Sequence, residues 1–360
     1  MRLHQTLKTN LLRGACLLFA LASGAIHAAN PAVIRIGSPQ IGVGQKFFPG
    51  VNTLAIVNAH GWLEEEFRKD GIEIQWVSFR GAGPAVNEAL ANKQLDIVSL
   101  GDLAAVIGKS SGTATRLILA NSRGANSYLA TSPGSDIKSV KDLKGRKVAV
   151  LLGTAYQRRF ELLLRDANLA PRDVKLVSLD WPTSKAAVVS KDIDATFGGN
   201  DLLLLRDKGV GIPLSTKGRG GDYTIQSSIL ASDDFATKHP EIVTRVVKQL
   251  VRAAAWAAED ANRDKVLALW ANGSSVPLEV LQHEFEGESV KARVSPLLDE
   301  AWVDVLKGVA EDGLEQKLIR RAVDVDAWID DRFLKEALKQ ARLERHWPKV
   351  KSDPKNDAKR

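Results

Sequence analysis

The chain has 360 residues with ordinary globular composition, 44% hydrophobic and 26% charged, which is long enough for two domains and a large core. Its formal net charge is +7, but residues 1–28 hold three Lys and Arg and no acid, so the remainder carries 47 bases against 43 acids. That balance gives no support for nucleic-acid binding. The single cysteine is Cys16, so the chain after residue 28 has no thiol for a disulfide, a nucleophile or a metal site.

The N-terminus has the pattern of a secretory signal peptide over residues 1–28. Basic residues come first, an apolar run of small and branched residues spans 17–26, and cleavage is expected near Ala28. The run is too short to cross a membrane. A lipid anchor on Cys16 is rejected because that residue precedes the apolar run. The mature protein is therefore expected to be exported.

Short apolar strands then alternate with helices. The first unit, 29–122, has expected strands at 33–37, 72–79, 96–100 and 117–120, and expected helices at 51–67, up to Asn92, and from Gly101-Asp102 toward Lys109. The pattern restarts in a second unit, 123–226, with expected strands at 128–131, 148–152, 173–179 and 194–197. A strand at 225–231 leads back to the first unit, and residues 227–345 complete it mainly with helices. The basic tail 346–360 is expected to be disordered.

This repetition predicts an α/β protein of two lobes, each a mixed sheet flanked by helices, joined by two crossing segments and followed by a helical C-terminal part. Ligands of such sheets bind outside the carboxyl ends of the strands. The candidate site is therefore made by four polar strand ends. They are Ser38 with Gln40, Gly101-Asp102, Gly153-Thr154, and Gly199-Asn200-Asp201.

The segment 147–169 shows the clearest anion-binding pattern. An apolar strand ends at Gly153-Thr154, and a helix follows whose apolar stripe is Phe160, Leu163, Leu164 and Ala167. Thr154 is a common N-cap residue, and the first-turn N–H groups have no intrahelical partner, so an anion fits there. Arg158 and Arg159 lie near the positive end of this helix, where cations are unfavourable. Either a bound anion offsets that cost, or both arginines are solvated surface residues.

The order of these segments resembles the periplasmic solute-binding proteins of ABC importers, in the sulfonate, nitrate and taurine family. The resemblance covers residues 33 to about 240. It rests on Ile34-Arg35-Ile36-Gly37, Gly61-Trp62-Leu63-Glu64-Glu65-Glu66-Phe67, Phe79, Gly83-Pro84, Glu88-Ala89-Leu90, Asp96, Gly101-Asp102, Asp142-Leu143-Lys144-Gly145-Arg146-Lys147-Val148-Ala149, Gly153-Thr154, Pro182 and Ile193-Asp194-Ala195.

The resemblance implies a type II periplasmic-binding fold that closes on a small anionic solute and delivers it to an ABC permease in the inner membrane. It also implies a monomer in the periplasm. The implied ligand loops lie at the same four strand ends and are Ser38 to Gln40, Gly101-Asp102, Gly153 to Tyr156 (with Ala155), and the segment near Gly199-Asn200. Sulfonate-binding relatives often show Ser-Ser-x-His after the glycine, where this chain has Thr154-Ala155-Tyr156-Gln157, and a Trp-Asp-Pro-type stretch where it has Gly199-Asn200-Asp201. The segment 42–50 is longer than usual and is a candidate lid.

Several side chains have two interpretations. Ser38 and Thr154 hydroxyls, with Arg80 or Arg158, are expected to bind an oxyanion, although a lone arginine such as Arg80 is commonly a surface residue. Asp102 either caps its own helix or receives a hydroxyl or amine of the ligand. The remaining candidates are Trp181 and Tyr156, each a ligand wall or core packing, and Trp256, Trp270, Trp302 and Trp328, all expected in the core.

No catalytic, cofactor or metal motif is found in the sequence. The histidines are scattered, with no two at metal-ligand spacing on one helix, and no G-x-S-x-G, phosphate loop or dinucleotide fingerprint is complete. The expected function is capture of an aliphatic sulfonate or a related organosulfur compound. The alternatives are nitrate, a sulfate ester or a pyrimidine precursor as solute, or a sensor subunit. An enzyme of the same fold that consumes its own histidine would need a histidine in the cleft, and the four strand ends carry none.

Overall fold

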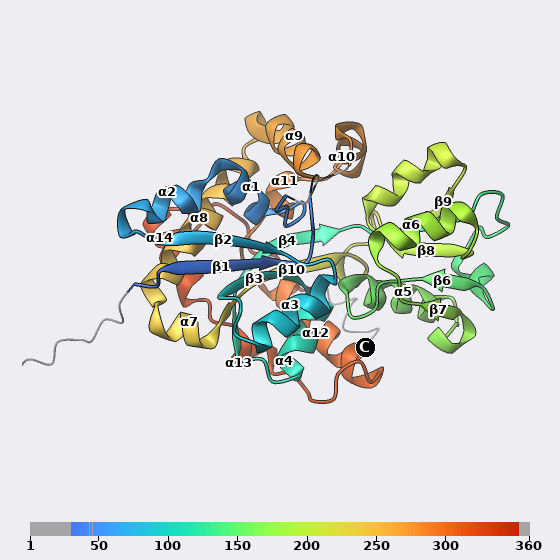
Figure 1. Cartoon of the computed structure of the whole chain (residues 1–360), viewed down its shortest axis with the longest axis horizontal. Coiled ribbons are helices and arrows are strands. Elements are labelled where there is room, and N and C mark those ends of the chain that lie inside the picture. Colours follow the sequence, from blue (N-terminus) through green and yellow to red (C-terminus); the bar gives the residue numbers. More distant parts are fainter. Residues whose placement is uncertain (1–29, 43, 45, 275, 353–360) are drawn as a thin grey trace, which may run out of the picture. The chain divides into compact units, whose positions relative to one another are not determined.

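The computed structural model describes residues 30–42, 44, 46–274 and 276–352, so the predicted signal peptide lies outside the described residues. It contains two five-stranded sheets, in the orders β2-β1-β3-β10-β4 and β7-β6-β8-β5-β9. Figure 1 shows that each sheet has its own helices, with the first sheet on the left and the second on the right. The expected two-lobed α/β fold is confirmed.

The first sheet is built from two stretches of the chain that lie far apart in the sequence. Strand β1 (Val33–Ser38) pairs in parallel with β2 (Glu73–Ser78) and β3 (Ile97–Gly101). The returning strand β10 (Ile225–Ser232) inserts antiparallel between β3 and β4 (Thr115–Ala125). The sheet is therefore completed only after the second lobe has been traversed.

The helices α1 (Thr53–His60), α2 (Trp62–Phe67), α3 (Ala82–Ala91) and α4 (Asp102–Ser110) belong to this first lobe. The expected single helix 51–67 is in fact two helices. Gly61 separates α1 from α2 with φ +64°, a left-handed conformation in which glycine carries no steric cost.

The second sheet is continuous in sequence. Its strands are β5 (Tyr128–Thr131), β6 (Lys147–Ala149), β7 (Lys175–Val177), β8 (Ala195–Gly198) and β9 (Gly211–Ser215). The helices are α5 (Ala155–Asp166) and α6 (Trp181–Ser190), followed by the 3₁₀ helix η5 (Asn200–Lys208). The expected strand 148–152 ends at Ala149, and β9 was missed because a short edge strand containing a proline lacks a clear strand pattern.

The C-terminal part is helical, as expected. Its longest helix, α8 (Pro240–Ala258), packs against α1 and α14 (Arg332–Ala341). Trp270, Trp302 and Trp328 are buried as predicted, whereas Trp256 is half-buried. The other elements are α7 (Asp233–Lys238), α9 (Arg263–Gly273), α10 (Leu278–Glu284), α11 (Val290–Arg293), α12 (Glu300–Glu315) and α13 (Val325–Trp328).

The described part of the tail is packed, which differs from the expected disorder of 346–360. Trp347 is 3% exposed and joins the core of the first lobe. The Val350 N–H donates to the Asp299 carboxylate, and the Val350 carbonyl accepts from the Ala301 N–H. The free energy gained by burying the Trp347 side chain outweighs the tendency of the charged residues around it to stay in solvent. Within the described part of the chain, no helix is long and apolar enough to cross a membrane.

Candidate functional site

The predicted ligand loops of the two lobes meet at the lobe boundary. Gly101, at the end of β3, lies so close to Ala155 at the start of α5 that a Cβ on Gly101 would be 3.1 Å from the Ala155 Cβ. Next to this contact, a Cβ on Gly153 would be 3.0 Å from Cγ of Pro84 in α3. Gly153 also has φ +74°, so glycine is required there for two reasons. Backbone from both lobes therefore approaches closely at the predicted position.

Asp102 forms a buried ion pair with Arg159 of the other lobe. Both side chains have 0% exposure, and Nη1 and Nη2 of Arg159 each lie 2.6 Å from a carboxylate oxygen. The Asp102 carboxylate also accepts from the Leu103 N–H, but the N-cap residue of α4 is Gly101 and no side chain caps the helix, so the capping interpretation is wrong. Burial lowers the pKa of Arg159, and the charge of Asp102 opposes that effect. No spacing in the sequence indicates that Arg159 is the partner of Asp102.

Arg158 also lies in the protein interior, with 2% of its side chain exposed. Its guanidinium is 2.7 Å from Asp312 of α12 and 2.9 Å from Asp222. The expectation that Arg158 binds the anion, or that both arginines are solvated, is therefore wrong. Carboxylates of the protein itself offset the unfavourable helix-dipole position of both arginines.

The Gly153-Thr154 loop is partly filled by its own side chains. The Thr154 hydroxyl donates to the Leu151 carbonyl at 2.6 Å, and Thr154 occupies the N-cap position without a side-chain cap bond. Gln157 accepts from the Gly153 N–H at 2.8 Å and donates to Glu161 at 2.9 Å. The first helical N–H groups, those of Ala155 and Tyr156, are the donors left for an anion.

Glu161 lies behind this loop and is 6% exposed, with Oε2 lacking a hydrogen-bond partner among the described residues. Burial raises the pKa of Glu161, the hydrogen bond from Gln157 lowers it, and the nearby charge of Asp312 raises it further. An ionised Glu161 only accepts hydrogen bonds, so it orients the Gln157 amide with its oxygen toward Gly153.

An aromatic surface in the second lobe is formed by Tyr156 and Trp181. Their rings meet edge to face at 5.1 Å. A Cβ on Gly199 would be 2.8 Å from the Tyr156 hydroxyl, so the glycine makes room for the ring. Burial raises the pKa of Tyr156, with smaller contributions from Asp201 and Glu284. Asp201 is itself paired with Lys185 at 2.7 Å.

The first-lobe candidates differ in exposure. Ser38 is fully buried, and its Oγ accepts from the Gln40 N–H at 3.4 Å, which leaves the hydroxyl hydrogen available for donation. Gln40 and Arg80 are exposed, and Asn200 is half-exposed. Hydrogen bonds from Thr183 lower the pKa of Asp180, and the charge of Arg80 contributes to the same shift, so Arg80 faces the second lobe.

A second buried polar cluster was missed by the sequence analysis. Tyr128 donates to Glu284, which is 3% exposed and also accepts from Asn126 at 2.9 Å. Arg293 pairs with Glu284 and with Glu288. Tyr128 and Glu284 are 156 positions apart, so no spacing pattern reveals the cluster.

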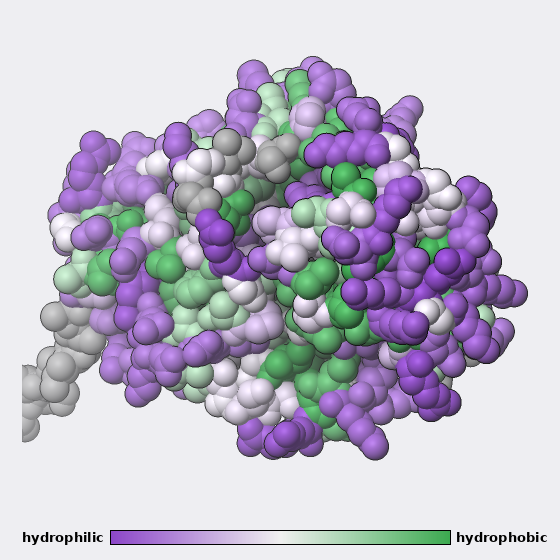
Figure 2. Space-filling view, turned by 45° about the vertical axis from the view of Figure 1, so that its right-hand side comes forward, coloured by the Kyte–Doolittle hydropathy of each residue, from purple (hydrophilic) through white to green (hydrophobic). Residues whose placement is uncertain are grey.

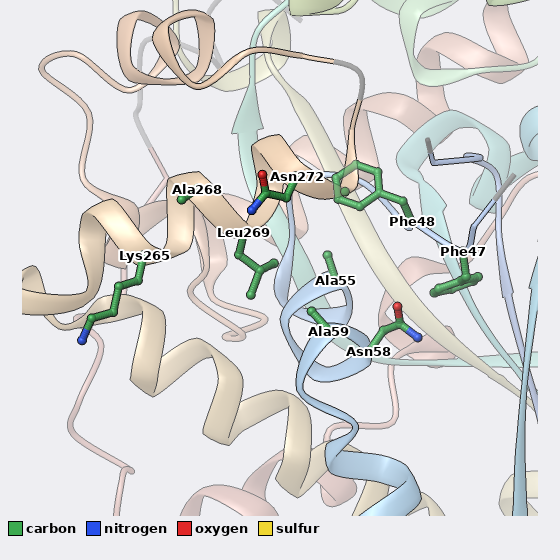
Figure 3. A pocket seen from close by; sticks show the side chains of 10 residues that line it. Phe47, Phe48, Ala55, Asn58, Ala59, Lys265, Ala268, Leu269 and Asn272 are labelled. Carbon is green, nitrogen blue, oxygen red and sulfur yellow. The ribbon is translucent and has the colours of Figure 1, made fainter. Parts of the chain in front are cut away.

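The described residues of the segment 42–50 pack on the first lobe, and Gly50 lies beside Gln40 of the predicted site. Phe48 packs so tightly on Gly273 that a Cβ there would lie 2.3 Å from its ring, and Phe47 contacts Trp76 with ring centroids 4.7 Å apart. Beside it lies a pocket of about 420 Å³ between this segment, α1 and α9 (Figure 3). None of the predicted ligand residues lines it. Its residues are Phe47, Phe48, Ala55, Asn58, Ala59, Lys265, Ala268, Leu269, Asn272 and Gly273.

Hydrophilic residues cover most of the face seen in Figure 2, with apolar residues between them. Among the described residues the exposed large apolar side chains are Leu152, Leu314 and Val350, and Leu152 directly precedes Gly153 at the lobe boundary. The described residues contain no group of three His, Cys, Asp or Glu placed to hold a metal ion.

The known proteins and solved structures that are similar to this chain agree with one another. A family model described as NMT1/THI5 like matches residues 56–263. A protein of Bacillus subtilis (strain 168), provisionally named an aliphatic sulfonates-binding protein, is 26% identical over 339 residues, covering 93% of this chain and 98% of its own. The crystal structure of the periplasmic sulfonate-binding protein SsuA from Methylobacillus flagellatus KT, also a provisional name, is 30% identical at TM-score 0.75, covering 89% of this chain and 98% of that chain. The alkanesulfonate-binding protein SsuA from Xanthomonas axonopodis pv. citri, bound to MOPS, shares the fold at 23% identity and TM-score 0.70, covering 84% and 100%.

Proposed function

Because this chain belongs to the NMT1/THI5-like family, we propose that it is a periplasmic substrate-binding protein of an ABC importer. Its solute is a small oxyanion, an aliphatic sulfonate or a related organosulfur compound. The single observation that supports this most is the meeting of Gly101 with Ala155, which brings the predicted ligand loops of both lobes to one place. The names carried by its relatives point to the same solute class.

The sulfonate head is proposed to bind donors that the protein leaves unused. These are the Ser38 hydroxyl, whose hydrogen is not engaged by Gln40, and the backbone N–H groups of Ala155 and Tyr156. Arg158 and Arg159 are paired with carboxylates of the protein, so neither is proposed to contact the solute. A sulfonate is permanently ionised. Neutral hydroxyl and backbone N–H donors can therefore bind it without a proton being transferred to or from the solute.

The organic tail is proposed to lie against Tyr156 and Trp181, whose edge-to-face pair offers an apolar wall with one hydroxyl. Gly199 and Asn200 border this wall, and Gln40 and Arg80 line the first-lobe edge. Asp102 and Thr154 are proposed to support these loops from behind, because Asp102 is occupied by Arg159 and the Thr154 hydroxyl by Leu151.

We also propose where the protein acts in the cell and what it does there. A signal peptide cleaved near Ala28 would deliver the protein to the periplasm, where it would act as a monomer, pass its solute to an inner-membrane permease and catalyse no reaction. The histidine-consuming enzyme of related fold is disfavoured by the four ligand loops, which contain no histidine.

A ligand screen by thermal unfolding tests the proposal. A solute at a hundred times its dissociation constant raises the unfolding free energy by about 2.7 kcal/mol. We expect ethanesulfonate or a longer alkanesulfonate to raise the melting temperature, and propionate, a carboxylate of matched length, to leave it unchanged. Taurine, sulfate esters, nitrate, sulfate and pyrimidine precursors form the other arms. A shift with one of these and none with sulfonates overturns the assignment.

An already bound solute would hide such a shift. The protein is therefore unfolded, dialysed and refolded before the screen, and the dialysate is analysed by mass spectrometry. Refolded protein that responds to no sulfonate contradicts the proposal. Turnover of the sulfonate during the assay, seen as release of sulfite, contradicts the binding-only role.

A further inference from the structure

Each of the two segments that join the lobes contacts its own buried polar cluster. The first crossing segment, 125–128, holds Asn126 and Tyr128, which bind the carboxylate of Glu284. The second crossing segment, 216–225, holds Asp222 and Thr224, which bind Arg158 and Arg159 at the start of α5. Both connections are therefore held by buried charged side chains, Glu284 at the first and Arg158 with Arg159 at the second.

The Asp102–Arg159 pair is bound to the second crossing segment as well as across the lobes. Arg159 donates from Nε and Nη2 to the Thr224 carbonyl at 3.1 and 2.6 Å, and the Gln226 N–H donates to Asp102 at 3.0 Å. The pair thus connects α4 of the first lobe, α5 of the second and the backbone that joins them. Groups fixed to the joining backbone move least when two lobes rotate about it.

Separating this pair would be costly. Both side chains have 0% exposure, so opening at this point would leave a carboxylate and a guanidinium without their buried partners. The Arg158 contacts beside it, to Asp222 and to Asp312, would have to break too. The arrangement favours rotation around the pair over separation through it.

We propose that Asp102 and Arg159 are positioning residues for ligand binding, acting as a pivot that stays paired while the lobes open and close. The inference depends on the proposed function only in that closure captures a solute. The pivot keeps the Gly101 edge against Ala155, so rotation moves the Tyr156–Trp181 surface relative to Ser38 without changing that contact. Neither charge touches the solute.

Spin-label distances between the lobes test the pivot. Glu88 in α3 and Ala186 in α6 are exposed, and no native cysteine follows residue 28, so cysteines placed at both take labels selectively. The variant replaces both partners, Asp102→Asn with Arg159→Gln, so that no unpaired charge remains. The control is Asp136→Asn with Arg146→Gln, an exposed pair within the second lobe whose separation is 2.7 Å, against 2.6 Å for Asp102 and Arg159.

For the native pair and the control, we expect one narrow distance distribution without ligand and a shifted narrow one with saturating ethanesulfonate. The Asp102→Asn/Arg159→Gln variant is expected to broaden the unliganded distribution and to weaken ethanesulfonate binding about tenfold. Should this variant not fold, Arg159→Lys keeps the charge but loses the two-pronged contact, and a smaller broadening is expected.

An unliganded distribution as narrow as the native one overturns the pivot. The same holds if only the liganded distribution changes, because the pair would then form on closure and act as a latch. If native protein fails to bind ethanesulfonate, the proposed solute is wrong, while the unliganded distributions still decide the pivot.

Discussion

The Nε atom of Arg158 lies 2.7 Å from an oxygen of Asp312, although 154 positions separate the two residues. Arg158 lies in the first turn of α5 in the second lobe, whereas Asp312 lies on α12 in the first lobe. A cation in the first turn of a helix is therefore used to hold two lobes together rather than to bind an anion.

Replacing Arg158 should destabilise the free protein and barely change ligand affinity. Arg158→Ala removes the partner of Asp222 and leaves Asp312 with the exposed Arg165 alone, and loss of one member of a buried pair costs about 3 kcal/mol. Chemical denaturation of unliganded protein measures the effect. Arg165→Ala is the control, because Arg165 also pairs with Asp312 but is 55% exposed, and it should cost below about 1 kcal/mol. Lost affinity without lost stability would return Arg158 to the ligand site.

Removing either of two hydroxyl groups should have different effects, one on folding stability and the other on ligand affinity. Thr154→Ala removes a bond donated to the Leu151 carbonyl and is expected to cost about 1 kcal/mol of folding stability with little loss of affinity. Ser38→Ala removes a donor that is still free and should weaken ethanesulfonate binding about tenfold at nearly unchanged stability. Calorimetric titration beside thermal unfolding tests both. The reverse pattern would move the anion to the Thr154 side chain.

Gly199 should control the position of the aromatic wall. Gly199→Ala places a methyl group 2.8 Å from the Tyr156 hydroxyl, so the ring must move away from Trp181, and affinity should fall about tenfold. Adding Tyr156→Phe removes the clashing oxygen and should restore part of the loss. No recovery in the double variant would show that the ring does not form part of the ligand wall.

Glu161 should make stability depend on pH. Its pKa is raised above the ordinary 4.5, chiefly by burial, so the folded protein holds a proton more tightly than the unfolded chain does. The protonated side chain supports folding at low pH, and this contribution is lost as the pH rises from 4.5 through the raised pKa. Glu161→Gln should remove that dependence, because the amide does not titrate. Melting temperatures from pH 4 to 8 test this, with exposed Glu88→Gln as a control expected to match the native curve.

The sequence predicted what depends on local pattern. Apolar runs ending in glycine located β1, β3 and β8, and the stripe of Phe160, Leu163 and Leu164 located α5, because burial on one side sets both. The break at Gly61 and the edge strand β9 were missed, since one left-handed residue and one short strand leave little trace in hydrophobic periodicity.

The strand ends named as candidate ligand loops come together in the structure, but the partners of their charged residues were not predicted. Gly101 and Ala155 do meet, as expected of strand ends in facing lobes. Asp102 binds Arg159, Arg158 binds Asp312 and Glu284 binds Asn126. These pairs are 57 to 158 positions apart, so their formation depends on the whole fold. An arginine in the first turn of a helix is stabilised by any nearby carboxylate. The sequence therefore does not show whether that carboxylate belongs to the protein or to a ligand.

The insertion of β10 between β3 and β4 has a consequence for the order of folding. As the chain is made, β3 can pair with β1, yet β4 must wait for β10, which begins only at Ile225. The second sheet, contiguous from β5 to β9, meets no such delay. The second lobe can therefore complete its sheet first, while the facing edges of β3 and β4 stay unpaired and open to aggregation or to a chaperone until β10 has been made.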